Sequence, residues 1–339
     1  PPAPAPPLSP PAPPLSSCSS SLSSCSCSGV EERLSGLSDL KVGGVVVGPI
    51  HVAPGDDVLS LRFEEVSSEA GSLQQFKDFV AAAHKKGISV VLDLTPNYQG
   101  SFGPWFSNTS VTNVAERLKS ALVFWMNEDV DGVQLAGVER VSTVVPSLWT
   151  DIRAIVQNGT KKDSKNKRVL IGLTERSSAE DVSALLSSTG VDLLISRVLR
   201  PGGADAMEHA QSVQLLYSNH SQLKLAWSLG GPAEGHLASL VGPALVRLHQ
   251  LLLLTLPGTP VINYGDEIGL MDKGTKFPRM LWDSDEQLNG TLQVNKHQRH
   301  GDKTLDLHSE YHENWEESVQ ELQVKVLSAV KFKLVRQSW

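Results

Sequence analysis

The sequence predicts an α/β protein with a parallel sheet, of the (β/α)8 TIM-barrel class. Three observations lead to this prediction: apolar strand-like runs alternate with helical patterns, single helices connect them, and seven such strands fit in about 235 residues. Because the count is one strand short of eight, we expect the barrel to be incomplete. A doubly wound open sheet is the alternative, but the chain lacks the glycine-rich phosphate-binding loop that this fold would need.

The predicted elements follow one another with short connections. The valine-rich run 42–50 contains no polar residue, which is typical of a strand buried on both faces. A helix follows at 72–86, with Ser72 as its N-cap and Gly87 as its stop, and a second buried strand covers 88–94. Further strands are expected near 130–135, 168–173, 191–196, 223–229 and 260–264, and further helices near 112–127, 145–157, 178–188, 206–219 and 236–256.

Composition and charge exclude several classes of protein. Hydrophobic residues make up 40% of the 339 residues and charged residues 20%, which is typical of a chain that folds around a sizeable core. The net charge is −7 and no basic run is interleaved with aromatic residues, so a nucleic-acid partner is not expected. The sequence contains no stretch of about 20 apolar residues that could span a membrane. No cofactor and no metal site are expected.

The segments on either side of the predicted barrel, 30–294, differ from it in composition. Residues 1–29 are rich in proline, serine and cysteine, which predicts disorder. Its thiols (Cys18, Cys25 and Cys27) are either unpaired or linked to another chain. Residues 295–339 are polar, except for a predicted amphipathic helix at 313–335. The apolar residues of its single face are Trp315, Val319, Leu322, Val326 and Val330.

Asn-x-Ser/Thr sequons recur along the chain, each in a polar stretch between apolar runs. Their acceptor residues are Asn108, Asn158, Asn219 and Asn289. A single match would carry little weight, but four in one chain favour glycosylation. The sequons therefore predict an extracellular or lumenal surface.

Several motifs in the predicted barrel occur in order with consistent spacing. They read V-G-G-V-V-V-G-P-I-H at 42–51, V-V-L-D-L-T-P-N-Y at 90–98, V-D-G-V-Q-L-A-G-V at 130–138, L-P-G-T-P-V-I-N-Y-G-D-E-I-G-L at 256–270 and M-L-W-D at 280–283. Together they resemble strand regions of the α-amylase family (glycoside hydrolase family 13). The resemblance is closer to the heavy subunits of heteromeric amino-acid transporters, the solute carrier family 3 type, and covers roughly residues 34–294.

The resemblance allows a comparison with the family's catalytic positions. Ala136 stands where the family has its nucleophilic aspartate, and Gln134 stands where it has an arginine. Tyr98 replaces a sugar-binding histidine, and Ala233 lies in the turn that carries the third carboxylate in active relatives. Glu175 matches the acid/base position. A retaining mechanism needs two carboxyl groups about 5–5.5 Å apart, so the resemblance implies a protein that is not an enzyme.

Other polar and aromatic residues of these motifs have structural explanations. Asp93 and Asn97 are expected to order the end of their strand and the loop after it. Asp266 and Glu267 are expected to belong to a structural loop after the last strand. Trp105, on a short aromatic loop, either packs over the barrel mouth or contacts a partner.

The resemblance implies a non-catalytic ectodomain of a type II membrane glycoprotein on the extracellular face of the plasma membrane. Its partner would be a multi-spanning light subunit of an amino-acid exchanger, which the heavy subunit stabilises and brings to the surface. Cys18, Cys25 or Cys27 would be the candidate for a disulfide to that partner.

Parts of the family pattern are not matched in this chain. The family's membrane helix and first barrel strand would precede residue 30. The domain that active relatives insert after the third strand and the C-terminal β domain have no counterpart in the sequence.

Two alternative functions stay open at this stage. One is a working α-glucosidase that uses Glu175 with Glu234 or Asp266. The other is a carbohydrate-binding or adhesion module without a transporter partner.

Overall fold

The computed structural model describes residues 30–53, 57–98, 105, 108–158, 168–201, 206–231, 234–278 and 280. Several predictions lie outside these residues: the disordered leader with its cysteines, the helix at 313–335, the sequon at Asn289 and the turn residue Ala233.

Helices and strands alternate along the described chain as predicted. The helices are α2 (Leu34–Asp39), α3 (Leu73–Lys85), α4 (Asn108–Asn127), α5 (Val138–Val144), α6 (Leu148–Asn158), α7 (Ala179–Thr189), α8 (Ala206–Asn219), α9 (Leu237–Val241) and α10 (Val246–Thr255). The strands are β1 (Gly44–Val47), β2 (His51–Val52), β3 (Arg62–Val66), β4 (Ser89–Asp93), β5 (Gly132–Ala136), β6 (Val169–Leu173), β7 (Leu193–Ser196), β8 (Leu225–Trp227) and β9 (Thr259–Pro260). Short 3-10 turns are η1 (Val58–Ser60), η2 (Gln222–Lys224), η3 (Pro243–Leu245) and η4 (Asp266–Ile268).

Seven of these strands form one sheet in the order β1-β4-β5-β6-β7-β8-β9. The pairs β1–β4, β4–β5, β7–β8 and β8–β9 are parallel. Each strand follows its sheet neighbour through a helical crossover, which is the pattern of a (β/α)8 barrel. Because β1 and β9 stand at the two ends of this order, the sheet of the described residues is not closed. The predicted incomplete (β/α)8 barrel is confirmed.

The chain divides into two compact units. The first comprises Pro1–Gly172 and Thr189–Val191, and the second comprises Leu173–Ser188 and Asp192–Trp339. The first unit contains β1, β4, β5 and most of β6, and the second contains β7, β8 and β9.

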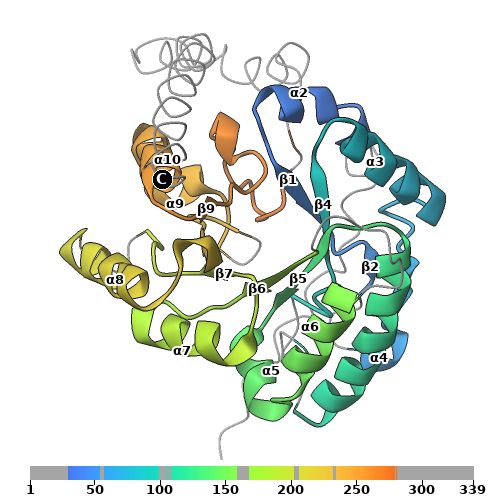
Figure 1. Ribbon diagram of the computed structural model, residues 1–339. Helices are drawn as coiled ribbons and strands as arrows, with labels where there is room; N and C mark the ends of the chain where they lie inside the picture. The colour runs from blue at the N-terminus through green and yellow to red at the C-terminus, as the bar shows by residue number, and fades with distance from the viewer. Residues whose placement is uncertain are drawn as a thin grey trace, which may run out of the picture. The chain divides into compact units, whose positions relative to one another are not determined.

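In the first unit, helices α3, α4 and α6 lie on the outer side of the strands (Figure 1). Helix α3 begins at a capping box. The Ser72 hydroxyl accepts a hydrogen bond from the Gln75 backbone N–H, and the Gln75 side-chain oxygen accepts one from the Ser72 backbone N–H. Phe76 of α3 meets Trp125 of α4 edge-to-face at 5.4 Å between ring centroids. Gly132 begins β5, where an added Cβ would lie 2.2 Å from the Val169 carbonyl oxygen. A glycine is therefore required where these backbones meet.

In the second unit, helices α7, α8 and α10 lie on the outer side of that unit's strands (Figure 1). Trp227 of β8 is buried and meets Tyr217 of α8 edge-to-face at 6.2 Å. Both side chains donate a hydrogen bond to the Pro257 carbonyl, at 2.9 and 2.8 Å. Gly258 has φ +132° and leaves no room for a Cβ beside the Trp227 ring. The segment that leads into β9 is thus held in place by Trp227, Tyr217 and Gly258.

Local chemistry accounts for the differences from the predicted elements. The helix expected at 236–256 is divided into α9, η3 and α10, because Gly242 has φ +78° and Pro243 cannot continue the hydrogen-bond ladder of α9. Helix α5 was not predicted, and it begins after Gly137 in a left-handed conformation. Strand β9 is shorter than the predicted 260–264, because the chain turns where the Asp266 N–H bonds to the Asn263 carbonyl.

One antiparallel pair, β2 with β3, was also missing from the prediction. It is too short to show a period in the sequence.

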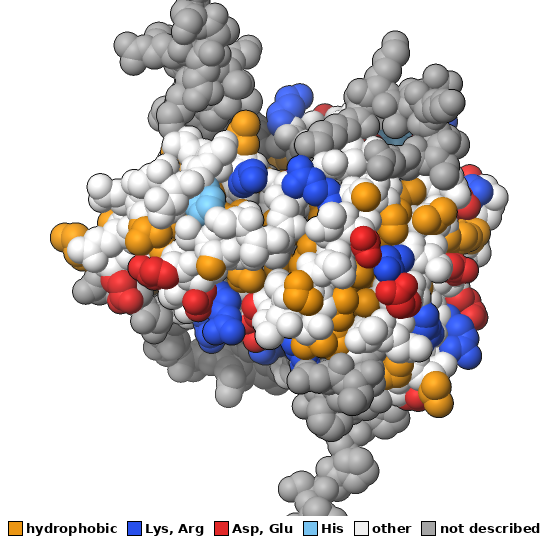
Figure 2. Space-filling model, turned by 60° about the horizontal axis from the view of Figure 1, so that its bottom comes forward, with side chains coloured by type: hydrophobic (Ala, Val, Ile, Leu, Met, Phe, Trp, Pro, Cys, Tyr) orange, Lys and Arg blue, Asp and Glu red, His pale blue; other side chains and the backbone are white. Residues whose placement is uncertain are grey.

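At the surface drawn in Figure 2, basic and acidic side chains are interspersed, and exposed hydrophobic side chains lie among them.

Candidate functional site

The carboxyl end of β4 carries a buried carboxylate that is surrounded by neutral donors. Asp93 is only 2% exposed. One of its oxygens accepts from the Thr95 backbone N–H at 2.8 Å, and the other accepts from the Tyr98 hydroxyl at 2.5 Å and the Gln134 amide at 2.9 Å. No arginine or lysine is among the partners described for it. Burial raises the pKa of Asp93, and these hydrogen bonds oppose the rise.

Tyr98 and Gln134 close this carboxylate off from ligands. Burial, followed by the charge of Asp93, raises the pKa of Tyr98 well above its ordinary value, so its hydroxyl stays protonated and donates. Gln134 is 7% exposed, within β5. An arginine at this position would bring a positive charge to Asp93, whereas the glutamine brings only a neutral N–H. The site is therefore a closed hydrogen-bond network.

Ala136 ends β5 beside this network. Its side chain is a methyl group, and the residue is 4% exposed. Its backbone N–H donates to the Thr95 hydroxyl at 2.9 Å, and its carbonyl accepts from the Trp105 indole N–H at 2.9 Å. The Asn97 side chain accepts from the Trp105 backbone N–H. The ordering roles expected for Asp93 and Asn97 are thereby confirmed, and Trp105, which is fully buried, packs rather than faces solvent.

In the second unit, Glu175 and Glu234 share one arginine. The Arg197 guanidinium, after β7, lies 3.4 Å from the Glu175 carboxylate and forms a short ion pair with that of Glu234. Glu234 is mostly buried, whereas the Glu175 side chain is 57% exposed. Both carboxylates of the glucosidase alternative are thus engaged by a cation.

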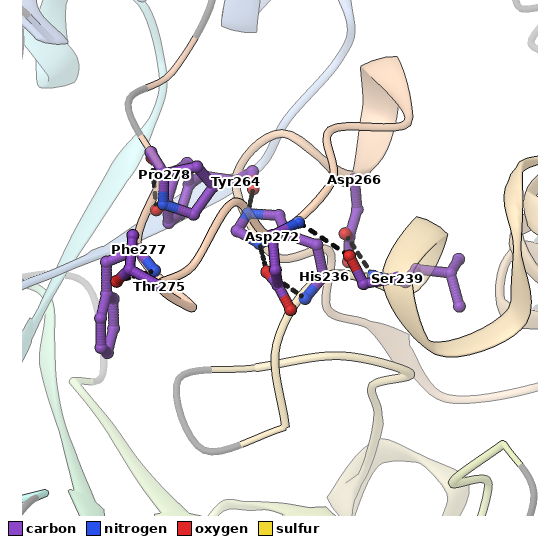
Figure 3. Close-up of polar contacts among 9 residues, drawn as sticks. His236, Ser239, Tyr264, Asp266, Asp272, Thr275, Phe277 and Pro278 are labelled. Carbon is purple, nitrogen blue, oxygen red and sulfur yellow. Dashed lines mark hydrogen bonds and ion pairs between the residues drawn. The ribbon is translucent and has the colours of Figure 1, made fainter.

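A second polar cluster of this unit was not predicted from the sequence (Figure 3). The His236 ring is fully buried, with Nδ1 2.7 Å from an Asp272 carboxylate oxygen and Nε2 2.9 Å from the Tyr264 carbonyl oxygen. Both partners are hydrogen-bond acceptors, so the buried ring is held from both sides. The Asp272 N–H in turn donates to the Ser239 hydroxyl at 2.7 Å. His236 and Asp272 are 36 residues apart in the sequence, so no local sequence pattern predicts that they pair.

Asp266 belongs to the same region and has a structural role, as expected. One of its oxygens accepts from the Leu237 N–H at 2.8 Å, at the start of α9, and its carbonyl accepts from the Gln250 amide of α10 at 2.6 Å. Burial raises the pKa of Asp266 to about 6. Burial also raises the pKa of the neighbouring Glu267. Asp266 thereby holds the loop after β9 against α9 and α10.

The described residues contain neither a candidate metal site nor a candidate membrane-spanning helix. They contain no group of three or more His, Cys, Asp or Glu side chains that could hold a metal ion. None of the helices they form combines the length and the apolar character needed to cross a membrane.

Comparison with known proteins connects this geometry to a family. The α-amylase catalytic-domain family model matches residues 23–113. The chain is 40% identical to the amino acid transporter heavy chain SLC3A2 of Oryctolagus cuniculus, over 79% of this chain and 50% of that protein. The chain belongs to the SLC3 heavy-chain family, within the α-amylase superfamily.

Other relatives of this SLC3 family member include a further transporter heavy chain and a neopullulanase. The mouse SLC3A2 heavy chain is 37% identical over 75% of this chain and 48% of its own length. Neopullulanase 2 of Thermoactinomyces vulgaris is 26% identical over 79% of this chain and 54% of its own length. The chain therefore spans about half the length of the curated relatives it matches.

Solved structures agree on the fold. The α-amylase of Geobacillus thermoleovorans, crystallised with acarbose, superposes with a TM-score of 0.60 at 19% identity, over 77% of this chain and 68% of that one. An Anoxybacillus α-amylase gives 0.61 at 17% identity, over 78% and 68%. At this level of identity the likeness concerns the fold alone.

The sequons of this SLC3 family member fall at helix ends where the structure describes them. Asn108 begins α4, Asn158 ends α6 and Asn219 ends α8. Asn219 is exposed, as a glycan acceptor has to be. Glycosylation stays a prediction.

Proposed function

We propose that this chain is the non-catalytic barrel of a transporter heavy subunit, which stabilises a multi-spanning amino-acid exchanger light subunit and brings it to the plasma membrane. The barrel would lie on the extracellular side. The observation that carries the proposal is the 40% identity with the SLC3A2 heavy chain of Oryctolagus cuniculus. Because the chain spans half of that relative, the role of the whole heavy chain is carried over here as a proposal.

The geometry at the end of β5 supports the non-catalytic part of this proposal. A glycosidase nucleophile has to be a carboxylate that reaches the anomeric carbon. Ala136 offers a methyl group, and the adjacent Asp93 is held by Tyr98 and Gln134. Among the described residues at this strand end, no carboxylate is therefore free to form a glycosyl intermediate.

The glucosidase alternative finds no support in the second unit. Glu175 and Glu234 both pair with Arg197 rather than with each other. Asp266, the other suggested partner, bonds to the Leu237 N–H and is 4% exposed. No observation favours the carbohydrate-binding or adhesion alternative.

Amino-acid uptake in cells tests the proposal. The chain is co-expressed with each member of a panel of multi-spanning exchanger light subunits, in cells that lack endogenous heavy subunits. An active α-amylase-type barrel targeted to the same compartment serves as the control. We expect uptake to rise several-fold above the light subunit alone with at least one partner. Unchanged uptake with every light subunit, at matched expression of the chain, would reject the role.

A further inference from the structure

Exposed apolar side chains are concentrated in one part of the second unit. Of the sixteen large hydrophobic side chains that are exposed among the described residues, ten lie between Leu245 and Phe277. Five of the ten belong to η3 and α10, and we call these the α10 patch: Leu245, Leu248, Leu251, Leu252 and Leu254. The other five lie in the segment after α10: Ile262, Tyr264, Ile268, Met271 and Phe277. A concentration of this kind marks a surface that is covered by another apolar group.

Helix α10 has two apolar faces. Val246 and Leu253 are 4% and 3% exposed and, at about 100° per residue, lie on the same face. The exposed leucines occupy the opposite half of the helix, where a solvated helix normally carries charged residues. The main packing partners of α10 are α9 and η3. Its outer face is therefore unpartnered within the described part of the chain.

We propose that the tail segment 313–335 covers the α10 patch. Five of its apolar residues are spaced at intervals of three and four, which predicts one continuous face on a helix. The members of that face are Trp315, Val319, Leu322, Val326 and Val330. Each surface would remove the other's apolar side chains from water. The proposal does not depend on the transporter role.

The course of the chain favours this occupant. The described chain continues for only a short stretch after α10, where Phe277 is exposed and the Pro278 carbonyl accepts from the Tyr264 hydroxyl at 2.9 Å. Residues 281–312 follow, and a flexible linker of that length has an end-to-end distance of about 30 Å. As a helix, 313–335 would be about 34 Å long, more than twice the length of α10. The segment can reach the patch and is long enough to cover it.

Charge also favours the tail segment over a second copy of the patch. Helix α10 contains Arg247 and His249 and no acidic residue. Residues 313–321 contain four glutamates and no basic residue. The two surfaces therefore carry complementary charge beside their apolar faces, whereas two α10 helices would bring like charges together.

Thiol reactivity in the full-length chain tests the proposal. In a background in which Cys18, Cys25 and Cys27 are serine, Leu248→Cys places one thiol in the patch. Leu223→Cys places the reference thiol at an 82% exposed site of η2 in the same unit. A covered thiol reacts only when its cover opens, so we expect Leu248→Cys to react with a disulfide reagent about tenfold more slowly than the reference. Adding Leu322→Asp and Val326→Asp should abolish this protection.

A matched variant and two conditions make the test decisive. Gln320→Asp and Ser328→Asp lie on the polar side of the predicted helix and should leave the protection intact. Equal reaction rates at both thiols, or protection that survives Leu322→Asp and Val326→Asp, would overturn the proposal. Protection that grows with protein concentration would assign the patch to a second copy. Protection that arises only with added phosphatidylcholine vesicles would assign it to a lipid surface. Either result would also overturn the proposal.

Discussion

The side-chain amide of Gln134 donates a hydrogen bond of 2.9 Å to the buried carboxylate of Asp93. The two residues come from neighbouring strands, since Gln134 lies opposite Asp93 in the β4–β5 pair. Together with Tyr98, Gln134 satisfies a buried charge without a cation. A cluster of this kind stabilises the strand ends, and it leaves no carboxylate free for chemistry.

Removing either neutral donor from Asp93 should destabilise the fold. We expect Gln134→Leu and Tyr98→Phe each to lower the free energy of unfolding by about 1–3 kcal/mol, because a buried charge loses a hydrogen bond. Both donors bond to the same oxygen, so the double variant should deviate from additivity. Urea denaturation at pH 7 measures this. Losses below about 0.5 kcal/mol in both single variants would contradict the described network.

Restoring a carboxylate at Ala136 should not restore hydrolysis. In Ala136→Asp the new charge would be buried next to the Asp93 network with no cation described there, so we expect a loss of about 2–4 kcal/mol in the free energy of unfolding. The neutral variant Ala136→Asn is the matched control and should lose less. Release of nitrophenol from an aryl α-glucoside should stay at the blank level for both. Turnover by Ala136→Asp would show that the second carboxylate is available after all.

His51 should make the protein sensitive to acid. Burial lowers the pKa of His51 from 6.5 to about 4, and neither ring nitrogen has a hydrogen-bond partner among the described residues. The unfolded chain therefore binds a proton below pH 6.5 that the folded chain takes up only near pH 4. Stability contributed by the neutral ring is complete above pH 6.5 and falls by about 3 kcal/mol as the pH drops to 4.

Replacing this histidine isolates its contribution from those of the carboxylates. In His51→Phe, beside Phe63 at 5.1 Å, the acid-dependent loss should be smaller than in the wild type by that amount. The measurement is the free energy of unfolding of both proteins between pH 4 and 7.5. Parallel curves would mean that His51 does not titrate on unfolding in this range.

The ion pair of His236 and Asp272 should hold the loop after β9. Asp272→Ala removes the acceptor of a buried ring N–H, and we expect it to cost about 3 kcal/mol, as breaking a buried ion pair does. Asp272→Asn keeps the shape and one acceptor oxygen, so its cost should be nearer 1 kcal/mol. Thermal unfolding of the three proteins at pH 6 provides the comparison. Equal stability of all three would show that the pair is not formed.

The sequence predicted those parts of the fold that depend on local pattern. Ser72 and the apolar spacing after it defined α3, and the valine run located β1, because capping and hydrophobic period act over a few residues. The break at Gly242 and Pro243 could have been recognised from the same kind of signal. The residue types at 134 and 136 led to the non-catalytic interpretation through the resemblance.

Contacts between distant residues could not be predicted in this way. Three groups of contacts join segments 22 to 37 residues apart in the chain, with nothing in local spacing to connect them: the His236–Asp272 pair, the Arg197 cluster and the Trp105 bond to the Ala136 carbonyl. They depend on how parallel strand ends and their loops meet, which only the folded structure provides.

Co-purification with a light subunit tests the central claim most directly. The tagged full-length chain is expressed with a multi-spanning exchanger light subunit, extracted in mild detergent and recovered through the tag. We expect the light subunit to be retained with the chain in a fixed ratio, and we expect Gln320→Asp, on the polar side of the helix predicted at 313–335, to leave this ratio unchanged. Recovery of a folded chain without any of the light subunits used in the uptake experiment would contradict the proposed heavy-subunit role.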